Sequence, residues 1–206
     1  MRVMSLRTWA WIAVAVAATG LLALVALRPP TPARPTSSAA APIGGAFELT
    51  DQTGRSVNQS LLTGKWSAVY FGYTYCPDVC PTTLQMLGTV QRSLGARQKD
   101  FQVVFVTVDP ARDTPSQLKL YLSNAVFPAG AVGLTGTPDQ IARITGAYGV
   151  YFQKEGTGAD YTVNHSSAIY LMNPSGGFDS VIASDSTPAD AAAAILKAMN
   201  AGSGRA

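Results

Sequence analysis

The segment WSAVYFGYTYCPDVCP, residues 66–81, has the character of a buried strand followed by a short loop and the start of a helix. Trp66–Tyr73 is apolar, rich in strand-forming residues and of strand length, which predicts a strand buried on both faces. Pro81 suits the first turn of a helix, and the apolar spacing after it predicts a helix from Thr82 to about Gln98. The segment therefore predicts the first strand and helix of an α/β domain.

The alternation of strands and helices continues along the chain. Phe101–Val108, FQVVFVTV, predicts a second buried strand. Three Thr-Pro pairs each combine a good N-cap with a proline suited to the first helical position. They predict helices over Pro115–Ala125, Pro138–Tyr148 and Pro188–Met199. Shorter strands are expected within Phe47–Gly54 and at Tyr161–Val163, Ala168–Met172 and Phe178–Ala183, the last two as a hairpin.

This order of elements predicts a mixed central sheet flanked by helices and completed by a β-hairpin. A thioredoxin-like fold satisfies the order. In α/β sheets, sites form at the carboxyl ends of strands. Cys76 and Cys80 follow the end of the Trp66–Tyr73 strand, so the fold class places them at such a site.

The N-terminal region reads as a membrane anchor, and residues 1–28 are taken as a cytoplasmic tip and one transmembrane helix. Thr8–Leu27 holds 20 residues without a charge, and at ~1.5 Å per residue these span about 30 Å, the thickness of a hydrocarbon core. Arg2 and Arg7 precede the segment, which predicts a cytoplasmic N-terminus and an exported domain. A cleaved signal peptide is the alternative, with the small residues Ala39–Ala41 as a possible cleavage site.

Beyond the anchor, composition suggests a spacer, one domain and a short tail. Residues 29–44 are rich in Pro, Ala and Ser and form a linker, residues 45–200 have the length of a single domain, and residues 201–206 form a flexible tail. Four of the 15 basic residues precede Gly45, which leaves 11 against 12 acidic residues. The exported part is thus nearly neutral, and nothing in it indicates nucleic-acid binding.

Cys76 and Cys80 are the only cysteines, and His165 is the only histidine. Each cysteine precedes a proline, which predicts extended backbone at both, with Cys80 at the N-cap of the next helix. A helix N-terminus favours thiolates, the form that binds metals and attacks disulfides. Two thiolates and one imidazole suit copper or zinc and do not suit magnesium or calcium.

Taken singly, these residues also have simpler, structural interpretations. Two cysteines outside the cytoplasm can form a structural disulfide, although a bridge between residues four apart closes too small a loop to stabilise much. A lone histidine is more often structural than a ligand. Asp109, Arg112 and Asp113 form another cluster, either a solvated Arg–Asp pair beside a capped turn or a loop that contacts a partner or orients the cysteine loop.

Three blocks, taken together, resemble the Sco/SenC family. They are FGYTYCPDVCP (71–81), VTVDPARDTP (106–115) and VNHSSAIYLMNPSG (163–176), and the resemblance covers about residues 45–199. Members are membrane-anchored, thioredoxin-like copper proteins that help to assemble cytochrome c oxidase.

The resemblance implies a function and a set of ligands. It implies that Cys76, Cys80 and His165 bind one Cu(I) or Cu(II) per domain, and that copper passes from an upstream donor to the dinuclear copper centre of the oxidase. It also implies a thiol–disulfide role at the cysteines of that centre. Many members have Asp before the ligand histidine where this chain has Asn164, which leaves affinity and pH dependence open.

Two functions are therefore compatible with the sequence. The first is a copper metallochaperone, a delivery protein without turnover of small molecules, anchored in the inner membrane of a bacterium with its domain on the periplasmic side. The alternative is an enzyme, a periplasmic thiol–disulfide oxidoreductase that keeps the oxidase cysteines reduced. The three-residue spacer differs from the commoner Cys-x-x-Cys redox spacing, and dithiol exchange needs no histidine. Both observations favour copper.

Overall fold

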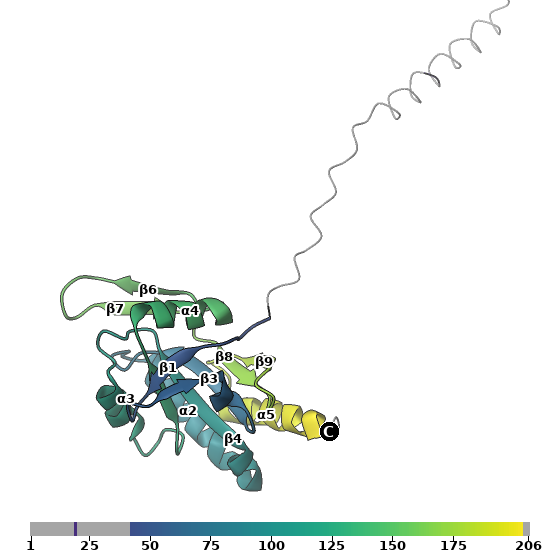
Figure 1. Cartoon of the computed structure of the whole chain (residues 1–206). Coiled ribbons are helices and arrows are strands. Elements are labelled where there is room, and N and C mark those ends of the chain that lie inside the picture. Colours follow the sequence, from purple (N-terminus) through teal and green to yellow (C-terminus); the bar gives the residue numbers. More distant parts are fainter. Residues whose placement is uncertain (1–18, 20–41, 204–206) are drawn as a thin grey trace, which may run out of the picture. The chain divides into compact units, whose positions relative to one another are not determined.

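The computed structural model describes Thr19 and residues 42–203. The chain divides into two units, residues 1–41 and 42–206, and the second carries the elements described below (Figure 1). The anchor expected over Thr8–Leu27 lies outside the described residues, apart from the helical Thr19. Among the described residues, no helix has both the length and the apolar character needed to span a membrane.

The described elements alternate between strands and helices along the chain. The strands are β1 (Glu48–Asp51), β2 (Ser56–Asn58), β3 (Trp66–Gly72), β4 (Phe101–Thr107), β5 (Val132–Thr135), β6 (Phe152–Glu155), β7 (Thr162–His165), β8 (Ile169–Met172) and β9 (Phe178–Ile182). The α-helices are α2 (Val79–Ser93), α3 (Pro115–Leu122), α4 (Pro138–Tyr148) and α5 (Pro188–Ser203), with 3₁₀ turns η1 (Gln59–Leu62) and η2 (Gly95–Asp100).

The main sheet has seven strands in the order β2-β1-β5-β4-β3-β8-β9. β3 and β4 pair in parallel from Trp66↔Phe101 to Gly72↔Thr107, and β5 continues the parallel part beside β4. β8 and β9 add the antiparallel hairpin next to β3, and β1 and β2 add an antiparallel edge on the other side. β6 and β7 form a separate two-stranded sheet.

Helices cover both faces of the main sheet (Figure 1). On one face, Tyr70 packs against Phe105, which in turn contacts Tyr121 of α3, and α2 and α5 pack together on this side. On the other face, Tyr148 of α4 packs against Phe71. Successive residues of a strand point to opposite faces, so the all-buried pattern of β3 follows directly from helices on both sides.

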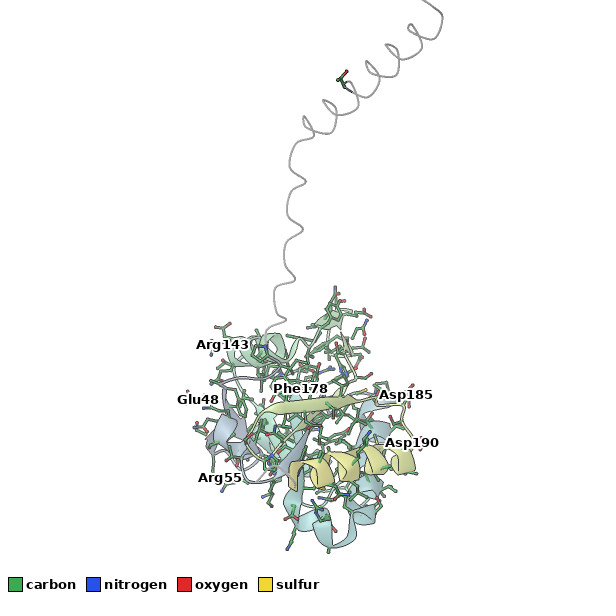
Figure 2. The ribbon with its side chains drawn as sticks, turned by 90° about the vertical axis from the view of Figure 1, so that its right-hand side faces the viewer. Glu48, Arg55, Arg143, Phe178, Asp185 and Asp190 are labelled. Atoms are coloured by element: carbon green, nitrogen blue, oxygen red, sulfur yellow. The ribbon has the colours of Figure 1, made fainter. Side chains whose placement is uncertain are left out.

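Charged side chains lie around the outside of this core. Figure 2 shows Arg55, Arg143, Asp185 and Asp190 at the periphery, and all four are exposed. The same view shows α5 beside β9, which carries Phe178.

One local expectation is wrong. Cys80 is not an extended N-cap: α2 begins at Val79 with Asp78 as its N-cap residue, so Cys80 lies inside the first helical turn. The helix tolerates Pro81 there because the first N–H groups of a helix have no intrahelical acceptor. The N–H of Cys80 is itself directed at the Sγ of Cys76, 3.4 Å away.

A candidate metal centre at the ends of the strands

The cysteine loop leaves the sheet where β3 and β4 end side by side, at Gly72 and Thr107. Gly72 is required there because of close packing. A Cβ added to it would lie 2.9 Å from the Sγ of Cys80 and 2.8 Å from the ring of Phe105. The absence of a side chain lets the sulfur of Cys80 pack directly beneath the end of the strand.

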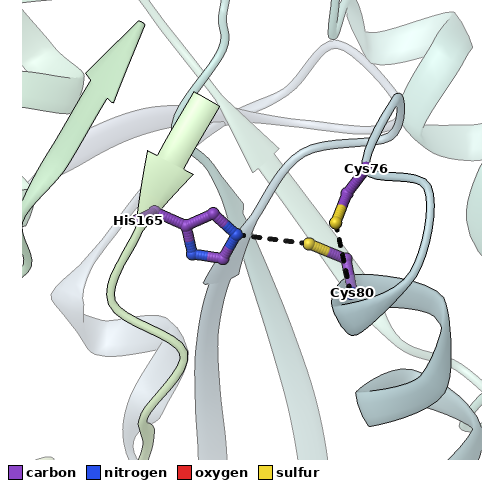
Figure 3. A group of neighbouring side chains, drawn as sticks. All are labelled: Cys76, Cys80 and His165. Carbon is purple, nitrogen blue, oxygen red and sulfur yellow. Dashed lines mark hydrogen bonds between the residues drawn. The ribbon is translucent and has the colours of Figure 1, made fainter. Parts of the chain in front are cut away.

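His165 reaches the same place from the other sheet. It is the last residue of β7, paired with Phe152 of β6. Its Nε2 lies 3.4 Å from the Sγ of Cys80, although the two residues are 85 positions apart in the chain (Figure 3). The two sulfurs and an imidazole nitrogen all lie within 4.8 Å of one another. The structure thus brings together the three residues expected to form the site.

The hydrogen bonds of His165 define its tautomer. Its Nδ1 lies 2.9 Å from the carbonyl oxygen of Ser166, which can only accept a hydrogen bond. In the neutral ring Nδ1 therefore carries the proton, and Nε2 presents a lone pair toward the sulfurs. An imidazole fixed in this way is oriented for metal ligation.

The two cysteines are free thiols with different environments. Cys80 is fully buried, whereas Cys76 is 9 % exposed. A hydrogen bond from Cys80, helped by the N–H groups of Asp78 and Cys80 and opposed by burial, lowers the pKa of Cys76 to about 4. The same hydrogen bond and burial raise the pKa of Cys80. The lowered pKa thus belongs to Cys76, the more exposed of the two sulfurs, and the raised pKa to the buried Cys80.

A cavity of about 260 Å³ opens onto the site. Cys76 and His165 line it together with Tyr73 and residues of the loop and of β7, and Cys80 is not among the lining residues. A ligand that enters the cavity therefore meets Cys76 and His165 first. Asn164 also lines this cavity and is exposed.

Aromatic rings enclose the imidazole. Tyr73 and Tyr70 both lie edge-on to His165, with ring centroids 5.9 and 6.5 Å away. Tyr73 packs around the site as its position beside the cysteines suggests, but Tyr75 is 54 % exposed and does not. The contribution of Tyr70 was not foreseen, because within the strand it reads as an ordinary core residue.

The charged cluster is buried rather than solvated. Arg112 and Asp109 pair at 2.5 Å with only 15 % and 5 % of their side chains exposed, and Asp113 is completely buried. Burial lowers the pKa of Arg112, but the hydrogen bond and charge of Asp109 outweigh it, so the pKa of Arg112 is raised. Asp113 accepts hydrogen bonds from the N–H and Oγ1 of Thr74, at 3.0 and 2.6 Å. The cluster therefore contacts the cysteine loop directly.

Asp78 occupies the N-cap position of α2, and its side chain makes no capping hydrogen bond within the described part of the chain. Thr74 is a site residue that the sequence did not reveal, since a single threonine between two tyrosines carries no distinctive signal.

Comparison with known proteins agrees with the fold and shows the family of the chain. The SCO1/SenC family model matches residues 35–200, and the chain belongs to this family. Protein SenC of Rhodobacter capsulatus is 40% identical over 168 residues, which are 80% of this chain and 75% of that protein.

Two solved structures share the thioredoxin-like architecture of this family. ScoI of Bradyrhizobium japonicum, solved with copper bound, is 44% identical, with a TM-score of 0.69 over 75% of this chain and 98% of that one. BsSco is described as a member of the Sco family of cytochrome c oxidase assembly proteins with a disulfide switch. It is 25% identical, with a TM-score of 0.62 over 76% of this chain and 92% of that one.

Proposed function

We propose that this protein is a copper metallochaperone that binds one copper ion through Cys76, Cys80 and His165. The observation that carries the proposal is the convergence of two sulfurs and one imidazole nitrogen within 4.8 Å. Metal–donor bonds of about 2.0–2.3 Å place three ligands roughly 4 Å apart, close to the spacing present here. Soft thiolates combined with imidazole are the donors that copper prefers.

The site is prepared to receive a cation with little rearrangement. The pKa of Cys76 is already lowered, and the Nε2 of His165 already faces the sulfurs. Only Cys80 must lose its proton, which the charge of a bound cation favours. A three-ligand set leaves a coordination position open on the cavity side, where another protein can attack and take over the ion.

The receiving partner that we propose is the subunit of cytochrome c oxidase that carries the dinuclear copper centre. The support is family membership together with two relatives, one with copper bound and one described as belonging to a family of oxidase assembly proteins. An upstream protein that supplies copper is part of this proposal. We also propose that Thr8–Leu27 anchors the chain in the inner membrane of a bacterium and that the domain works on the periplasmic side, on the strength of the uncharged segment and the preceding arginines.

The decisive experiment is a copper titration of the reduced full chain. We expect one equivalent of Cu(II) to bind and to produce thiolate-to-copper charge-transfer absorption. Cys76→Ser or Cys80→Ser should abolish these bands. His165→Ala should shift the bands and weaken binding at least about 10–100-fold, the loss that follows even from mutating an outer-shell partner of a ligand.

Thr162→Ala is the matched control, because Thr162 is an exposed residue of the same strand as His165. It should bind copper as the wild type does. If His165→Ala leaves the spectrum and the affinity unchanged, the imidazole is not a ligand and the proposed site is wrong.

The unequal cysteines also favour a second function, thiol–disulfide exchange. The thiolate of Cys76 would attack a target disulfide and displace one target thiolate, forming a mixed disulfide. Cys80, once deprotonated, would then attack the Sγ of Cys76 and release the second target thiolate. Two electrons pass to the target, and the protein is left with a Cys76–Cys80 disulfide.

His165 separates the two functions. Reduction of a disulfide-bonded peptide by the reduced protein should survive in His165→Ala if exchange is an activity of the pair itself. The Cys76→Ser variant should be inactive in the same assay. Loss of exchange in His165→Ala, with Cys76 still reactive toward alkylating reagents, would argue against an independent oxidoreductase function.

A further inference from the structure

The two halves of the site belong to different sheets. The cysteine loop follows β3 of the seven-stranded sheet, and His165 ends β7 of the two-stranded sheet. Within the described residues, no strand pairing joins β6 or β7 to the main sheet. Only three residues separate His165 from β8 of the main sheet, so the chain itself limits the distance between the sulfurs and the imidazole, and side-chain contacts can set it more finely.

Arg112 holds the hairpin that carries His165. Its Nη1 donates to the carbonyl oxygens of Tyr161 and Ala159, at 3.0 and 3.3 Å. Its guanidinium carbon lies 3.6 Å from the ring centroid of Tyr161. Tyr161 immediately precedes β7, so these contacts fix the backbone four residues before His165.

Arg112 also contacts the cysteine loop. The guanidinium carbon lies 4.7 Å from the ring centroid of Tyr75, the residue next to Cys76. It lies 5.7 Å from the ring of Tyr73, whose edge-on contact with His165 was described above. The same guanidinium thus touches both halves of the site.

Arg112 is itself held in place by its neighbours at the end of β4. The Nε of Arg112 donates to Oδ2 of Asp109, and the hydroxyl of Tyr161 donates to Oδ1 of the same carboxylate at 2.7 Å. Asp113, the next residue, binds Thr74 in the cysteine loop and Thr107 at the end of β4. Arg112 is therefore held at the carboxyl end of β4 while it reaches the loop and the hairpin.

We propose that Arg112 is a positioning residue that sets the distance between the Cys76–Cys80 pair and His165. The effect of Arg112 on copper affinity rests on the proposed copper function. Its effect on the distance between the two halves of the site rests on the contacts described above. Arginine is suited to the task because its planar fork donates in several directions while its faces stack on aromatic rings. Lysine can keep the charge beside Asp109 but provides neither the fork nor the stacking surface.

One further observation fits a role beyond stability. The Nη2 of Arg112 is buried and has no hydrogen-bond partner among the described residues. An unpartnered buried donor costs free energy, so burying this guanidinium is not the arrangement that stability alone favours. Its position between the two halves of the site gives a reason for this burial.

A double-mutant cycle on the full chain tests the proposal. Copper affinity is measured by chelator competition for the wild type, Arg112→Lys, His165→Ala and the double variant. We expect Arg112→Lys to weaken binding about tenfold when His165 is present, at the low end of the effect of losing an orienting partner. In the His165→Ala background the same substitution should change affinity less than about twofold, since no imidazole remains to be positioned.

A second measurement needs no metal. In the NMR spectrum of the copper-free chain, the close approach of the Tyr73 and His165 rings should give nuclear Overhauser contacts, and these should weaken in Arg112→Lys. If the wild type does not bind copper, the function proposed above fails while the ring contacts still test the positioning role. Intact ring contacts, or equal losses of copper affinity in both backgrounds, would refute that role.

Two further variants complete the design. Arg55→Ala removes another Arg–Asp pair, at 2.8 Å, in the turn between β1 and β2, and should leave affinity and ring contacts unchanged. Should Arg112→Lys fail to fold, Tyr75→Ala enters the same cycle, because it removes an exposed ring from the loop side of the contact. Its effect on affinity should likewise depend on the presence of His165.

Discussion

Cys76 and Cys80 are chemically alike but differ in charge and access. The hydrogen bond between them places the negative charge on Cys76, the cysteine that lines the cavity. Cys80 remains a thiol packed against Gly72 and Phe105. The reactivity of the site should therefore belong to one sulfur.

Alkylation of the copper-free protein should show this directly. Because the pKa of Cys76 is lowered to about 4, its rate of reaction with iodoacetamide should be flat from about pH 8 to pH 6 and should fall at lower pH as the thiolate is protonated. Cys80 should stay unmodified over this range. Mass spectrometry of the digested protein locates the label, and a rate that rises through pH 8–9 would show an ordinary thiol at Cys76.

Asp113 is the residue whose loss should cost the most stability around the site. Asp113→Ala leaves the N–H of Thr74 and two hydroxyls without their acceptor, so we expect a loss of about 2–4 kcal/mol in the free energy of unfolding. Urea unfolding of the copper-free protein measures it. A loss below about 0.5 kcal/mol would mean that water replaces the carboxylate.

Burial raises the pKa of Asp113, against the opposing hydrogen bonds of Thr107 and Thr74. A carboxyl whose pKa is raised by folding binds its proton more tightly in the folded protein than in the unfolded chain. The protonated form of Asp113 therefore contributes to stability, and this contribution is complete below the pKa of the unfolded chain. It is lost as the pH rises through the folded value. Asp113→Asn should remove this part of the pH dependence.

At the scale of single elements, helix α2 shows how closely the cysteine-bearing helix is packed. A Cβ added to Gly88 would lie 2.3 Å from the carbonyl oxygen of Val126, in the segment after α3. We expect Gly88→Ala to destabilise by about 1–3 kcal/mol through overpacking, despite a gain of up to about 1 kcal/mol in helix propensity.

Gly146 in α4 is the matched comparison. A Cβ there meets nothing within 4 Å, so Gly146→Ala should stabilise the domain by up to about 1 kcal/mol. The two variants are compared by urea unfolding. Similar effects of the same sign would show that propensity, and not the contact with Val126, governs Gly88.

The elements predicted well are those with strong local signals. β3 and β4 are apolar runs, and the Thr-Pro pairs before α3 and α4 form the expected caps, with Thr114 and Thr137 accepting from the N–H three residues on. Cys80 was misplaced because the preference of a residue before proline for extended backbone is a steric tendency, and the helix that begins at Val79 overrides it here.

The missed strands lack such signals. β5 has only four residues and includes Gly133, which a pattern search reads as a breaker. The structure needs that glycine, since a Cβ would lie 2.7 Å from Leu122 of α3. β6 is largely exposed and polar, so its pairing with β7 depends on partners that no local pattern contains. The meeting of Cys76, Cys80 and His165 was expected from the resemblance of three sequence blocks to a known family, whereas the role of Arg112 depends on contacts in space.

At the scale of the whole molecule, the site joins two sheets. Copper ligated by residues of both should tie the β6–β7 hairpin to the domain and raise overall stability. At a free concentration 1,000 times the dissociation constant, a bound ligand stabilises by about 4 kcal/mol, which corresponds to an increase of about 10 °C in the midpoint of thermal unfolding for a domain of this size.

Hydrogen exchange locates this stabilisation. Amides of Phe152–Glu155 and Thr162–His165 should exchange more slowly with copper bound, and addition of a chelator should restore the original rates. In His165→Ala, copper should leave these amides unaffected. Slowing that is equal in the variant and the wild type would mean that the hairpin does not respond to ligation.

The different burial of the two sulfurs has a consequence for how copper would be transferred to an acceptor. An acceptor thiol arriving from solvent can approach only through the opening beside Cys76, because the sulfur of Cys80 is enclosed on every side. In the copper delivery that we propose, handover is then sequential and directional: the outer bond is exchanged first and the innermost last, so the ion need never be released as a free hydrated species.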